Sequence, residues 1–587
     1  MLVLTHGAPR ALFASTSSFR IVRAAVLCAA LGALGTLAGG LAAPAPALAK
    51  TAPPKPVLDA SAVAVPDRYS ADTAQQIFAA GGNAVDAAVA IAFTLAVTRP
   101  DAGNIGGGGF MTLFVDGKPY FLDYRERAPQ QATRDMYVDD KGNLVPGMSV
   151  VGHRAVGVPG TVDGMWEAQR RFGKLKWKQV LAPAIHYASD GFVIDPSLQQ
   201  RRDAAAKAFT GKTNFDAYFS SLNAGTTFRQ PELAQTLSRI AGDGGREFYE
   251  GRTADLIAQQ MYGHGLVTKQ DLMQYKAVWR QPLSADWHGY RVITAPPPSS
   301  GGIGLIQMLK MKAALKPAFE GLELNCAPYI HLIAQIEDRV FADRQRYLGD
   351  PDAYKVPTAK LIDDAYLAQR ADEVKPDEVP GATPVKPGLA DALPEKAQTA
   401  HFSVVDKWGN AVSNTYTLNG DFGAGVVVDG GGFLLNDAMD DFVAKPGSEG
   451  AGGADVNTIA PGRRPLSSMT PTLLLKDNKA ALVIGTPGGS RILTSIFQVM
   501  TNLYDFDMAP TAALAAMRFH HQLLPQKTIY FEPFYPSTGE LAEQLKAMGY
   551  TLEVQSFNGD VQMVRVEGTT PEPAADPRGV GVARVIR

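Results

Sequence analysis

Two threonines stand where a β-hairpin would bring their hydroxyl groups together. The segment TAHFSVVDKWGNAVSNTYTLN, which begins at Thr399, alternates apolar and polar residues on both sides of a turn. If residues 407–409 form a three-residue loop with Gly409 in the left-handed conformation, counting outward along both strands sets Thr399 opposite Thr417. The Cβ atoms of facing residues lie about 4.5–5.5 Å apart, so the two hydroxyls can meet. A slip of one residue would change these partners, and on the pattern alone both are ordinary strand threonines.

A glycine pair lies where a strand gives way to a helix. The run GTPGGSR follows the apolar segment ALVI and precedes a helical pattern, so the amides of Gly488 and Gly489 are expected at a helix N-terminus. Amides in that position suit an oxyanion hole, although a simple strand-to-helix turn also explains these residues. No Lys-Ser or Lys-Thr pair follows at the spacing of a phosphate-binding loop, which argues against a nucleotide site.

Alternating helix and strand signals must position these groups. Residues 70–99 predict two helices separated by a Gly-Gly pair, with Asn83 as the N-cap of the second helix. The following segment NIGGGGFMTLFVDGKPYFLDYRERAP predicts a strand, an Asp-Gly turn and a second strand that ends at Arg125. No repeat of 20–50 residues is visible, so a solenoid is not expected.

The composition is that of a packed, nearly neutral protein. Of the 587 residues, 46% are hydrophobic and 19% charged, and the net charge is −2. This balance argues against a nucleic-acid binder led by a basic surface. Two cysteines cannot build a disulfide framework or a cysteine-only zinc site. The length suggests two to four domains or one large α/β unit.

The first 49 residues have the features of an export signal. The first fifty residues contain no Asp or Glu, carry Arg10, Arg20 and Arg23, and then run apolar from position 24 to 43. A small-x-small cleavage site ends at Ala49, which predicts a periplasmic or secreted protein. A permanent membrane anchor is the alternative, because twenty apolar residues can just span a bilayer.

The composition changes abruptly between Val374 and Gln398. The segment VKPDEVPGATPVKPGLADALPEKAQ is rich in proline and lacks any apolar period, which predicts a mobile surface stretch over residues 374–398. The strongly β pattern that follows predicts a structured element beginning at Thr399.

Ordered motifs along the chain resemble those of the γ-glutamyltransferase (glutathione hydrolase) family. Before the proline-rich stretch they are GGNAVDAAVA, NIGGGGFM, DYRERAP, VGVPGTVDGM, PPPSSGGI and FADRQRYLGD. After it they are the hairpin segment, FLLNDAMDDF, RRPLSSMTPT, GTPGGSRI and RFHHQLLP. The resemblance extends from about Asp67 to the C-terminus, and the order of so many motifs makes it specific.

This resemblance implies a fold and a maturation step. Members are α+β N-terminal-nucleophile (Ntn) hydrolases with a four-layer αββα sandwich built by two subunits of one autoprocessed precursor. The precursor cuts itself before a threonine, and the match is Thr399, which follows Gln398. The implied parts are a signal peptide (1–49), a large subunit (50–398) and a small catalytic subunit (399–587), which form a heterodimer.

The implied chemistry uses Thr399 twice. In the precursor its hydroxyl attacks the carbonyl carbon of Gln398, and the resulting ester hydrolyses. Cleavage releases an α-amine whose pKa of about 7.7–8.0 suits a general base, so the amine can take the proton of its own hydroxyl. The resemblance assigns Thr417 to hydrogen-bond the nucleophile, a pairing that the hairpin count reaches independently, and Gly488 and Gly489 to the oxyanion hole.

A γ-glutamyl group carries an α-carboxylate and an α-ammonium, and the resemblance supplies residues for both. Arg125, Ser467 and Ser468 match the carboxylate-binding residues, Asp441 matches the carboxylate that pairs with the ammonium, and Asn419 matches a neighbouring amide. Without the surrounding motifs, Arg125 would be interpreted as a surface ion-pair partner and Ser467 and Ser468 as loop caps. Asp441 and the Asp before it would be interpreted as a solvated turn. The implied substrates are glutathione and other γ-glutamyl compounds, with water, an amino acid or a dipeptide as acceptor and no metal or organic cofactor.

Two departures from the family pattern bear on specificity. The family commonly has Gln or Glu where this chain has Ala438, and losing one hydrogen bond to a charged group, worth about 1.5–3 kcal/mol, weakens binding by one to two decades. Alternatively, the pocket accepts another acyl group, as in the related cephalosporin acylases. The segment 445–457 also looks shorter than in lidded members and lacks their aromatic gate, which favours hydrolysis over transfer.

Two rival functions stay open at this point. One is a cephalosporin- or glutaryl-type amide acylase on the same scaffold, which Ala438 favours and Asp441 opposes. The other is an exported binding protein that keeps the pocket without turnover. The adjacent pair His520-His521 is predicted to be structural, because neighbours in a strand face opposite ways. No G-x-S-x-G motif is present, which argues against an α/β-hydrolase serine enzyme.

Overall fold

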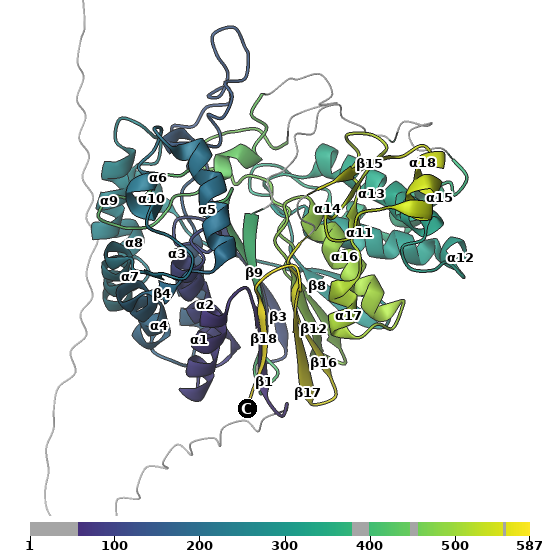
Figure 1. Cartoon of the computed structure of the whole chain (residues 1–587), viewed down its shortest axis with the longest axis horizontal. Helices are drawn as coiled ribbons and strands as arrows, with labels where there is room; N and C mark the ends of the chain where they lie inside the picture. The colour runs from purple at the N-terminus through teal and green to yellow at the C-terminus, as the bar shows by residue number, and fades with distance from the viewer. Residues whose placement is uncertain (1–56, 379–384, 386–397, 446–455, 556–558) are drawn as a thin grey trace, which may run out of the picture. The chain divides into compact units, whose positions relative to one another are not determined.

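Two antiparallel β-sheets lie face to face in the middle of the fold (Figure 1). The computed structural model describes residues 57–378, 385, 398–445, 456–555 and 559–587. Within these residues the first sheet has seven strands, in the order β18 (Val582–Ile586), β1 (Ser61–Val65), β9 (Gln398–Val405), β10 (Ala411–Asn419), β2 (Gly108–Val115), β3 (Lys118–Asp123) and β6 (Val278–Arg280). The second has six, in the order β17 (Thr570–Ala575), β16 (Gln562–Glu567), β12 (Lys479–Gly485), β11 (Thr472–Lys476), β8 (Tyr290–Thr294) and β7 (Leu283–Trp287).

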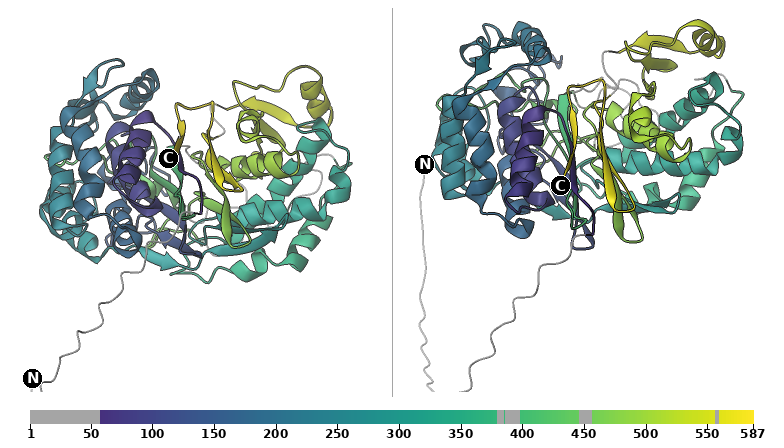
Figure 2. Two further views of the ribbon diagram at one scale, coloured as in Figure 1. Left: turned by 90° about the horizontal axis from the view of Figure 1, so that it is seen from below. Right: turned by 60° about the horizontal axis from the view of Figure 1, so that its bottom comes forward.

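Helices cover the outer face of each sheet (Figures 1 and 2). The first sheet carries α1 (Arg68–Ala79), α2 (Ala84–Thr98), α3 (Thr161–Phe172), α4 (Trp177–Asp190), α5 (Pro196–Phe209), α6 (Phe215–Phe219), α7 (Pro231–Asp243), α8 (Glu247–Glu250), α9 (Arg252–Met261) and α10 (Lys269–Gln274) on its side. The second carries α11 (Gly301–Ala314), α12 (Lys316–Phe319), α13 (Ala327–Tyr347), α14 (Thr358–Leu361), α15 (Asp364–Asp372), α16 (Arg491–Tyr504), α17 (Pro510–Ala515) and α18 (Gly539–Ala547). Small sheets of β4 (Phe192–Val193) with β5 (Thr227–Phe228), and of β13 (Phe519–His520), β14 (Thr528–Phe531) and β15 (Thr551–Val554), lie among these helices.

The two sheets share one apolar layer and each packs a second layer against its helices. Strand β1 shows this directly, because successive side chains point to opposite faces of a sheet. Val63 and Val65 belong to the core beneath the helices, whereas Ala62 and Ala64 face the second sheet. Helices, two sheets and helices therefore form the four-layer αββα sandwich, and the predicted fold class is confirmed. The chain from Pro54 onward forms one compact unit. The length allowed either two to four domains or one large unit, and the structure shows one large unit.

The first helices form where the sequence predicts them. Helix α2 begins after Asn83, whose side chain accepts hydrogen bonds from the amides of Val85 and Asp86, both at 3.0 Å. The Asp86 carboxylate accepts the amide of Asn83 at 2.8 Å, which completes a capping box. Every residue of α2 is buried, and this explains its run of alanine and valine.

The β9–β10 hairpin has the predicted loop and most of the predicted register. Gly409 adopts the left-handed conformation with φ of 82°, and the amide of Asp406 donates to the carbonyl of Asn410 at 2.9 Å. Residues pair as expected as far as Ala400 and Tyr416. Beyond them the register shifts, so that Gln398 pairs with Asn419.

The register shift has a local cause. The Thr417 hydroxyl accepts the amide of Asn419 at 2.8 Å, and Asn419 adopts a left-handed backbone with φ of 84°. A side chain that bonds the backbone two residues ahead competes with the strand ladder. The result is an irregularity of the β-bulge type at the end of β10, next to Thr399.

Several predictions from the sequence fall on residues that the structure does not describe. These are the leader at 1–49, most of the stretch 374–398, and positions 446–455 of the short segment after residue 445. The stretch 374–398 is packed where it begins, because Val374 is buried and the Lys375 amide donates to the Gln335 side chain at 3.0 Å. No helix in the described part of the chain is long and apolar enough to span a membrane.

Candidate active site

The two predicted threonines meet at the start of β9. The hydroxyl oxygens of Thr399 and Thr417 lie 3.5 Å apart, at the outer limit of hydrogen-bonding distance, and both residues are buried. The chain entering β2 passes so closely that a Cβ atom on Gly107 would lie 2.0 Å from the Thr417 carbonyl oxygen. The glycine run therefore lets β2 pair beside the threonines without displacing them.

His401 supports the strand that carries Thr399. Its ring nitrogens contact the hydroxyls of Thr415 at 2.8 Å and Ser403 at 3.1 Å. Burial lowers the pKa of His401 to about 3, so the ring is neutral at physiological pH. A Cβ atom on Gly485 would lie 2.3 Å from the His401 ring. The last residue of β12 thus lies against β9, two residues from Thr399.

The predicted glycine pair comes shortly after Gly485 in the chain. Gly488 and Gly489 lie between β12 and α16, with φ angles of 145° and 59°. Their carbonyls accept the amides of Arg491 at 3.2 Å and Ile492 at 3.1 Å, which opens α16. The predicted strand-to-helix position is confirmed, and the oxyanion role of the two amides stays a prediction.

Opposite charges meet at the end of β3. The guanidinium of Arg125 is fully buried and pairs with the carboxylates of Glu126 at 2.7 Å and of Asp441, which lies in the short 3₁₀ helix η2 (Ala438–Asp441). Burial alone would lower the pKa of Arg125, but these two carboxylates outweigh it and raise the pKa above its usual value. Arg125 and Asp441, 316 positions apart in the chain, are therefore direct neighbours.

A buried network ties the segment RRPLSS to this charged pair. Asp123 accepts the Arg125 amide at 2.9 Å and the Arg280 guanidinium at 2.7 Å, and forms an ion pair with Arg464 at 3.4 Å. The Arg125 side chain in turn donates to the Pro465 carbonyl at 3.4 Å. Two residues beyond Pro465 the predicted serines follow, so the network places them beside Arg125.

Both predicted serines are buried and held by neighbouring loops. The Ser467 amide donates to the Pro298 carbonyl at 3.0 Å, and the Ser467 carbonyl accepts the Ser300 amide at 2.7 Å. The Ser468 hydroxyl accepts the Arg344 guanidinium at 3.2 Å. The two serines thus join the end of α13 to the segment that lies behind Arg125.

Asn419 links the threonine strand to η2. Its side-chain amide donates to the Asp437 carbonyl at 3.1 Å, and the Asp437 carboxylate accepts the Gly420 amide at 2.7 Å. Ala438 is fully buried, and its own amide donates to Asn436 at 3.0 Å. The structure therefore brings Asn419 next to η2, the segment that carries Asp441. The first residue of η2 is Ala438, whose side chain is a methyl group.

Some residues of this site were not singled out from the sequence. Glu126 pairs with Arg125, Ser149 donates to the Asp440 carboxylate at 2.5 Å, and Arg344 holds Ser468. The doublet Arg125-Glu126 after an apolar strand was a usable signal, because two adjacent charges at the end of a buried strand need partners. No local pattern points to Ser149 or Arg344, whose partners lie more than 100 positions away.

The adjacent histidines take separate structural partners. His520 contacts the Thr494 hydroxyl at 3.0 Å, whereas His521 contacts the Asp338 carboxylate at 2.8 Å and the Thr528 carbonyl at 2.7 Å. Burial lowers the pKa of His520 to about 3. Burial opposes protonation of His521, but Asp338 outweighs it and raises the pKa to about 9. Each histidine thus fixes a different pair of elements.

The four-layer sandwich with a threonine at the start of a central strand defines the class of N-terminal-nucleophile hydrolases. A family model described as Gamma-glutamyltranspeptidase matches residues 70–586. The chain belongs to the γ-glutamyltranspeptidase family.

Relatives and solved structures agree with this placement. The Glutathione hydrolase proenzyme of Pseudomonas aeruginosa is 60% identical over 536 residues, which cover 90% of this chain and 95% of the relative. The Glutathione hydrolase proenzyme of Escherichia coli is 42% identical, with 88% and 90% covered. A cephalosporin acylase structure from Bacillus halodurans superposes with a TM-score of 0.78 at 27% identity, covering 92% of this chain and 98% of the other. The γ-glutamyltranspeptidase of Pseudomonas nitroreducens complexed with L-DON gives 0.56 at 56% identity, covering 56% and 99%.

The contact between Gly485 and His401 predicts a strong effect of one methyl group. We expect Gly485→Ala to lower the free energy of unfolding by about 1–3 kcal/mol, because the new Cβ meets a buried ring that has no room to move. Gly242→Ala is the matched control, since nothing lies within 4 Å of its Cβ position and it stands in helix α7. Thermal unfolding of both variants checks this, and equal melting temperatures would show that the contact is not tight.

Proposed function

We propose that this enzyme cleaves the γ-glutamyl amide of glutathione and related γ-glutamyl compounds and passes the glutamyl group to water, an amino acid or a dipeptide. The observation that carries the proposal is the position of Thr399. Its hydroxyl oxygen lies 3.5 Å from the hydroxyl oxygen of Thr417, where β9 begins. The Arg125–Asp441 pair lies where β3 finishes, which is at the same end of the first sheet. The names of the relatives as glutathione hydrolase proenzymes support both the substrate and the need for processing.

Processing comes first, because the Thr399 nitrogen of the intact chain is an amide and cannot accept a proton. The Thr399 hydroxyl attacks the carbonyl carbon of Gln398, and an ester replaces the peptide bond. Water then hydrolyses the ester, which divides the chain into two subunits. Residues 50–398 and 399–587 stay together as a heterodimer, since β1 of the first part pairs between β18 and β9 of the second, and β10 of the second pairs with β2 of the first. The freed α-amine then serves as the base for its own hydroxyl.

Turnover uses the charged pair as a clamp for the donor. The α-carboxylate of the glutamyl group binds Arg125 with help from Ser467 and Ser468, and its α-ammonium binds Asp441 near Asn419. Thr399 attacks the γ-carbonyl, whose developing negative charge is stabilised by the amides of Gly488 and Gly489. The amine leaves with a proton, and water or an acceptor amine then attacks the γ-glutamyl-threonine ester and frees the Thr399 hydroxyl.

We place the mature enzyme in the periplasm or outside the cell. The support is the leader itself, with its arginines, its apolar run and the small residues that end at Ala49.

A second candidate function is an amide acylase for acyl groups that lack the glutamate ammonium. The buried methyl group of Ala438 favours it, because this position offers no hydrogen bond to an ammonium. A relative named Acylase ACY 1 proenzyme from a Pseudomonas strain is 35% identical over 460 residues. Asp441 beside Arg125 opposes it, since this carboxylate would have no ammonium to pair with on an acyl group such as glutaryl.

The maturation step predicts a simple pattern of fragments. Purified wild-type protein should separate on a denaturing gel into two chains, residues 50–398 and 399–587. Thr399→Ala should stay one chain because the attacking hydroxyl is gone, whereas Thr399→Ser, which keeps a hydroxyl, should still be cleaved. Cleavage of the Ala variant at the same bond would mean that another group performs the reaction.

The clamp predicts which donor is preferred. Wild-type enzyme should hydrolyse γ-glutamyl-p-nitroanilide with a higher kcat/KM than glutaryl-p-nitroanilide, which lacks the ammonium. Asp441→Asn should reduce this preference about 10- to 100-fold, since a hydrogen bond to a charged group is worth about 1.5–3 kcal/mol. Asp190→Asn, an exposed carboxylate on α4, serves as the control. A wild-type preference for the glutaryl donor would favour the acylase instead.

A further inference from the structure

A second charged cluster lies on the other side of Thr399 from the Arg125–Asp441 pair. Its centre is Asp101, which is buried and contacts the Arg99 guanidinium at 3.1 Å and the Arg201 guanidinium at 2.8 Å. The Arg201 side chain is 28% exposed and reaches Asp101 through Nε. Its Nη2 atom donates to the Ser197 hydroxyl at 3.2 Å, whereas no hydrogen bond joins Nη1 to another described residue, so the Nη1 group can bind an anion.

Two carboxylates complete this cluster. Asp421 and Asp560 come from different parts of the chain, yet both feel the positive charges of Arg99 and Arg201. The Oδ1 atom of Asp421 is buried and has no hydrogen-bond partner in the described part of the structure. Burial raises the pKa of each carboxyl group to about 7, and the negative charge of Asp101 near Asp421 and of Asp576 near Asp560 adds to this rise.

Both carboxylates are attached to the catalytic elements. Asp421 lies four residues after Thr417, on the turn that leaves β10. The amide of Asp560 donates at 2.8 Å to the hydroxyl of Thr486, the residue just before Pro487 and the predicted oxyanion glycines. One carboxylate therefore follows the strand that carries Thr417, and the other belongs to a residue that is hydrogen-bonded to the loop leading to the glycines.

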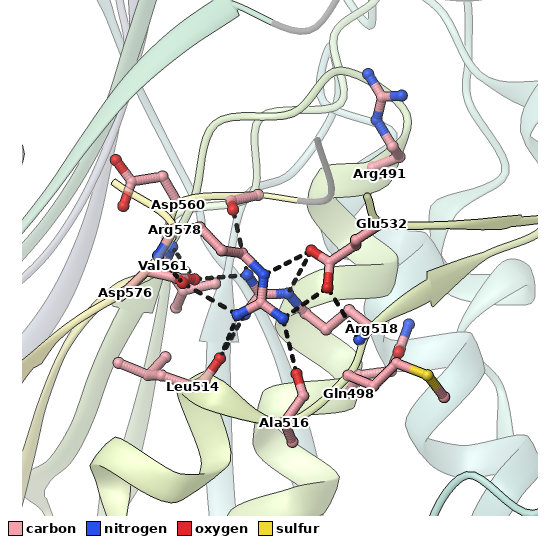
Figure 3. Close-up of polar contacts among 12 residues, drawn as sticks. Arg491, Gln498, Leu514, Ala516, Arg518, Glu532, Asp560, Val561, Asp576 and Arg578 are labelled. Carbon is pink, nitrogen blue, oxygen red and sulfur yellow. Dashed lines mark hydrogen bonds and ion pairs between the residues drawn. The ribbon is translucent and has the colours of Figure 1, made fainter. Parts of the chain in front are cut away.

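The position of Asp560 is fixed by a buried ionic network, which Figure 3 shows. Arg518 pairs with Asp576 at 2.6 Å and donates to the Gly559 carbonyl at 3.2 Å. The Asp576 carboxylate also accepts the Val561 amide at 2.9 Å. The residues on both sides of Asp560 are thus held, and in Figure 3 its own carboxylate is turned away from the arginines of the network.

The strand order places Arg99 and Asp560 of this second cluster on the side of β9 that lies away from Arg125. Asp421 follows β10 and joins the cluster because the amide of the next residue, Phe422, donates to the Asp101 carbonyl at 3.0 Å. The neighbouring strands of the first sheet are β18-β1-β9-β10-β2-β3, and Arg125 follows β3, on one side of β9. On the other side, Arg99 donates to the carbonyl of Pro66 at 3.3 Å, directly after β1. Gly579, shortly before β18, lies against Asp560, because a Cβ atom there would be 2.4 Å from the carboxylate. A glutamyl group held at Arg125 must direct its scissile amide past Thr399, toward this cluster.

We propose that Arg201, Asp421 and Asp560 form the subsite for the leaving group and the acceptor, and that it selects amines that also carry a carboxylate, such as α-amino acids and dipeptides. Arg201 binds the carboxylate, while Asp421 and Asp560 bind the ammonium. This subsite rests on the proposed γ-glutamyl transfer, because it receives what leaves or enters at the γ-carbonyl. The mixed charge fits the Cys-Gly part of glutathione, which has the same two groups once released.

The test uses three acceptors that differ in charge, with γ-glutamyl-p-nitroanilide as donor to the mature enzyme. Glycylglycine has an ammonium and a carboxylate, glycinamide has only the ammonium, and hydroxylamine is neutral. Arg201→Gln should raise the ratio of the glycylglycine KM to the glycinamide KM about tenfold. Asp421→Asn should raise the KM values of both charged amines about tenfold relative to hydroxylamine.

Two control variants carry the same substitutions on the surface. Arg170→Gln on α3 and Asp190→Asn on α4 replace exposed charges with partners on their own helix, so their acceptor ratios should equal those of wild type. If Asp421→Asn is not processed, the Arg201→Gln ratio decides the question alone. Unchanged ratios in processed Arg201→Gln and Asp421→Asn would overturn the subsite while γ-glutamyl transfer stands. A wild-type enzyme that does not release p-nitroaniline at all would overturn the proposed function and the subsite with it.

Discussion

The pairing of β9 with β10 is the interaction on which the site depends. The ladder runs from the loop at 407–409 to Ala400 and Tyr416, and this register alone brings the first residue of the predicted small subunit to Thr417. Asp406 secures the closed end of the hairpin, where its buried carboxylate accepts the amides of Ala84, Trp408 and Asn410 at 2.9–3.0 Å. The bulge at the open end breaks the ladder beside Thr399, where the backbone must be cut. A regular strand would have placed that peptide bond within continuous pairing.

Charge on either side of β9 gives the site its direction. On one side the Arg125–Asp441 pair is already desolvated, so a zwitterionic glutamyl group can exchange one ion pair for two without a further large cost of burying charge. On the other side Asp101 binds two arginines, whose positive charge also acts on the nearby carboxylates of Asp421 and Asp560. In the proposed reaction, donor and acceptor therefore approach Thr399 from opposite sides of β9.

Much of this arrangement was accessible from the sequence, because it rests on local rules. The Asn83 cap, the strands that end near Arg125, the loop at Gly409 and the glycines before α16 follow from turn and capping chemistry over a few residues. The four layers and the assignment of roles came from resemblance to a family, since no local rule states which strands become neighbours.

What the sequence did not disclose depends on partners that are far apart in the chain. The bulge at Thr417 arises from a side-chain hydrogen bond that the hairpin count ignores. Ser149, Arg344 and the acceptor-side cluster join residues separated by more than a hundred positions, so their contacts exist only once both sheets have formed. Composition could not reveal them either, because each is a single charged or polar residue among many.

The most direct test of this account is to trap the acyl-enzyme. Mature enzyme would be mixed with a γ-glutamyl donor, quenched in acid within the first turnover and digested, and its peptides would be sequenced by mass spectrometry. The account predicts a γ-glutamyl ester on the hydroxyl of Thr399, in a peptide that begins at Thr399 with a free α-amine. An ester on another residue, or an active enzyme in which Gln398 and Thr399 are still joined, would contradict it.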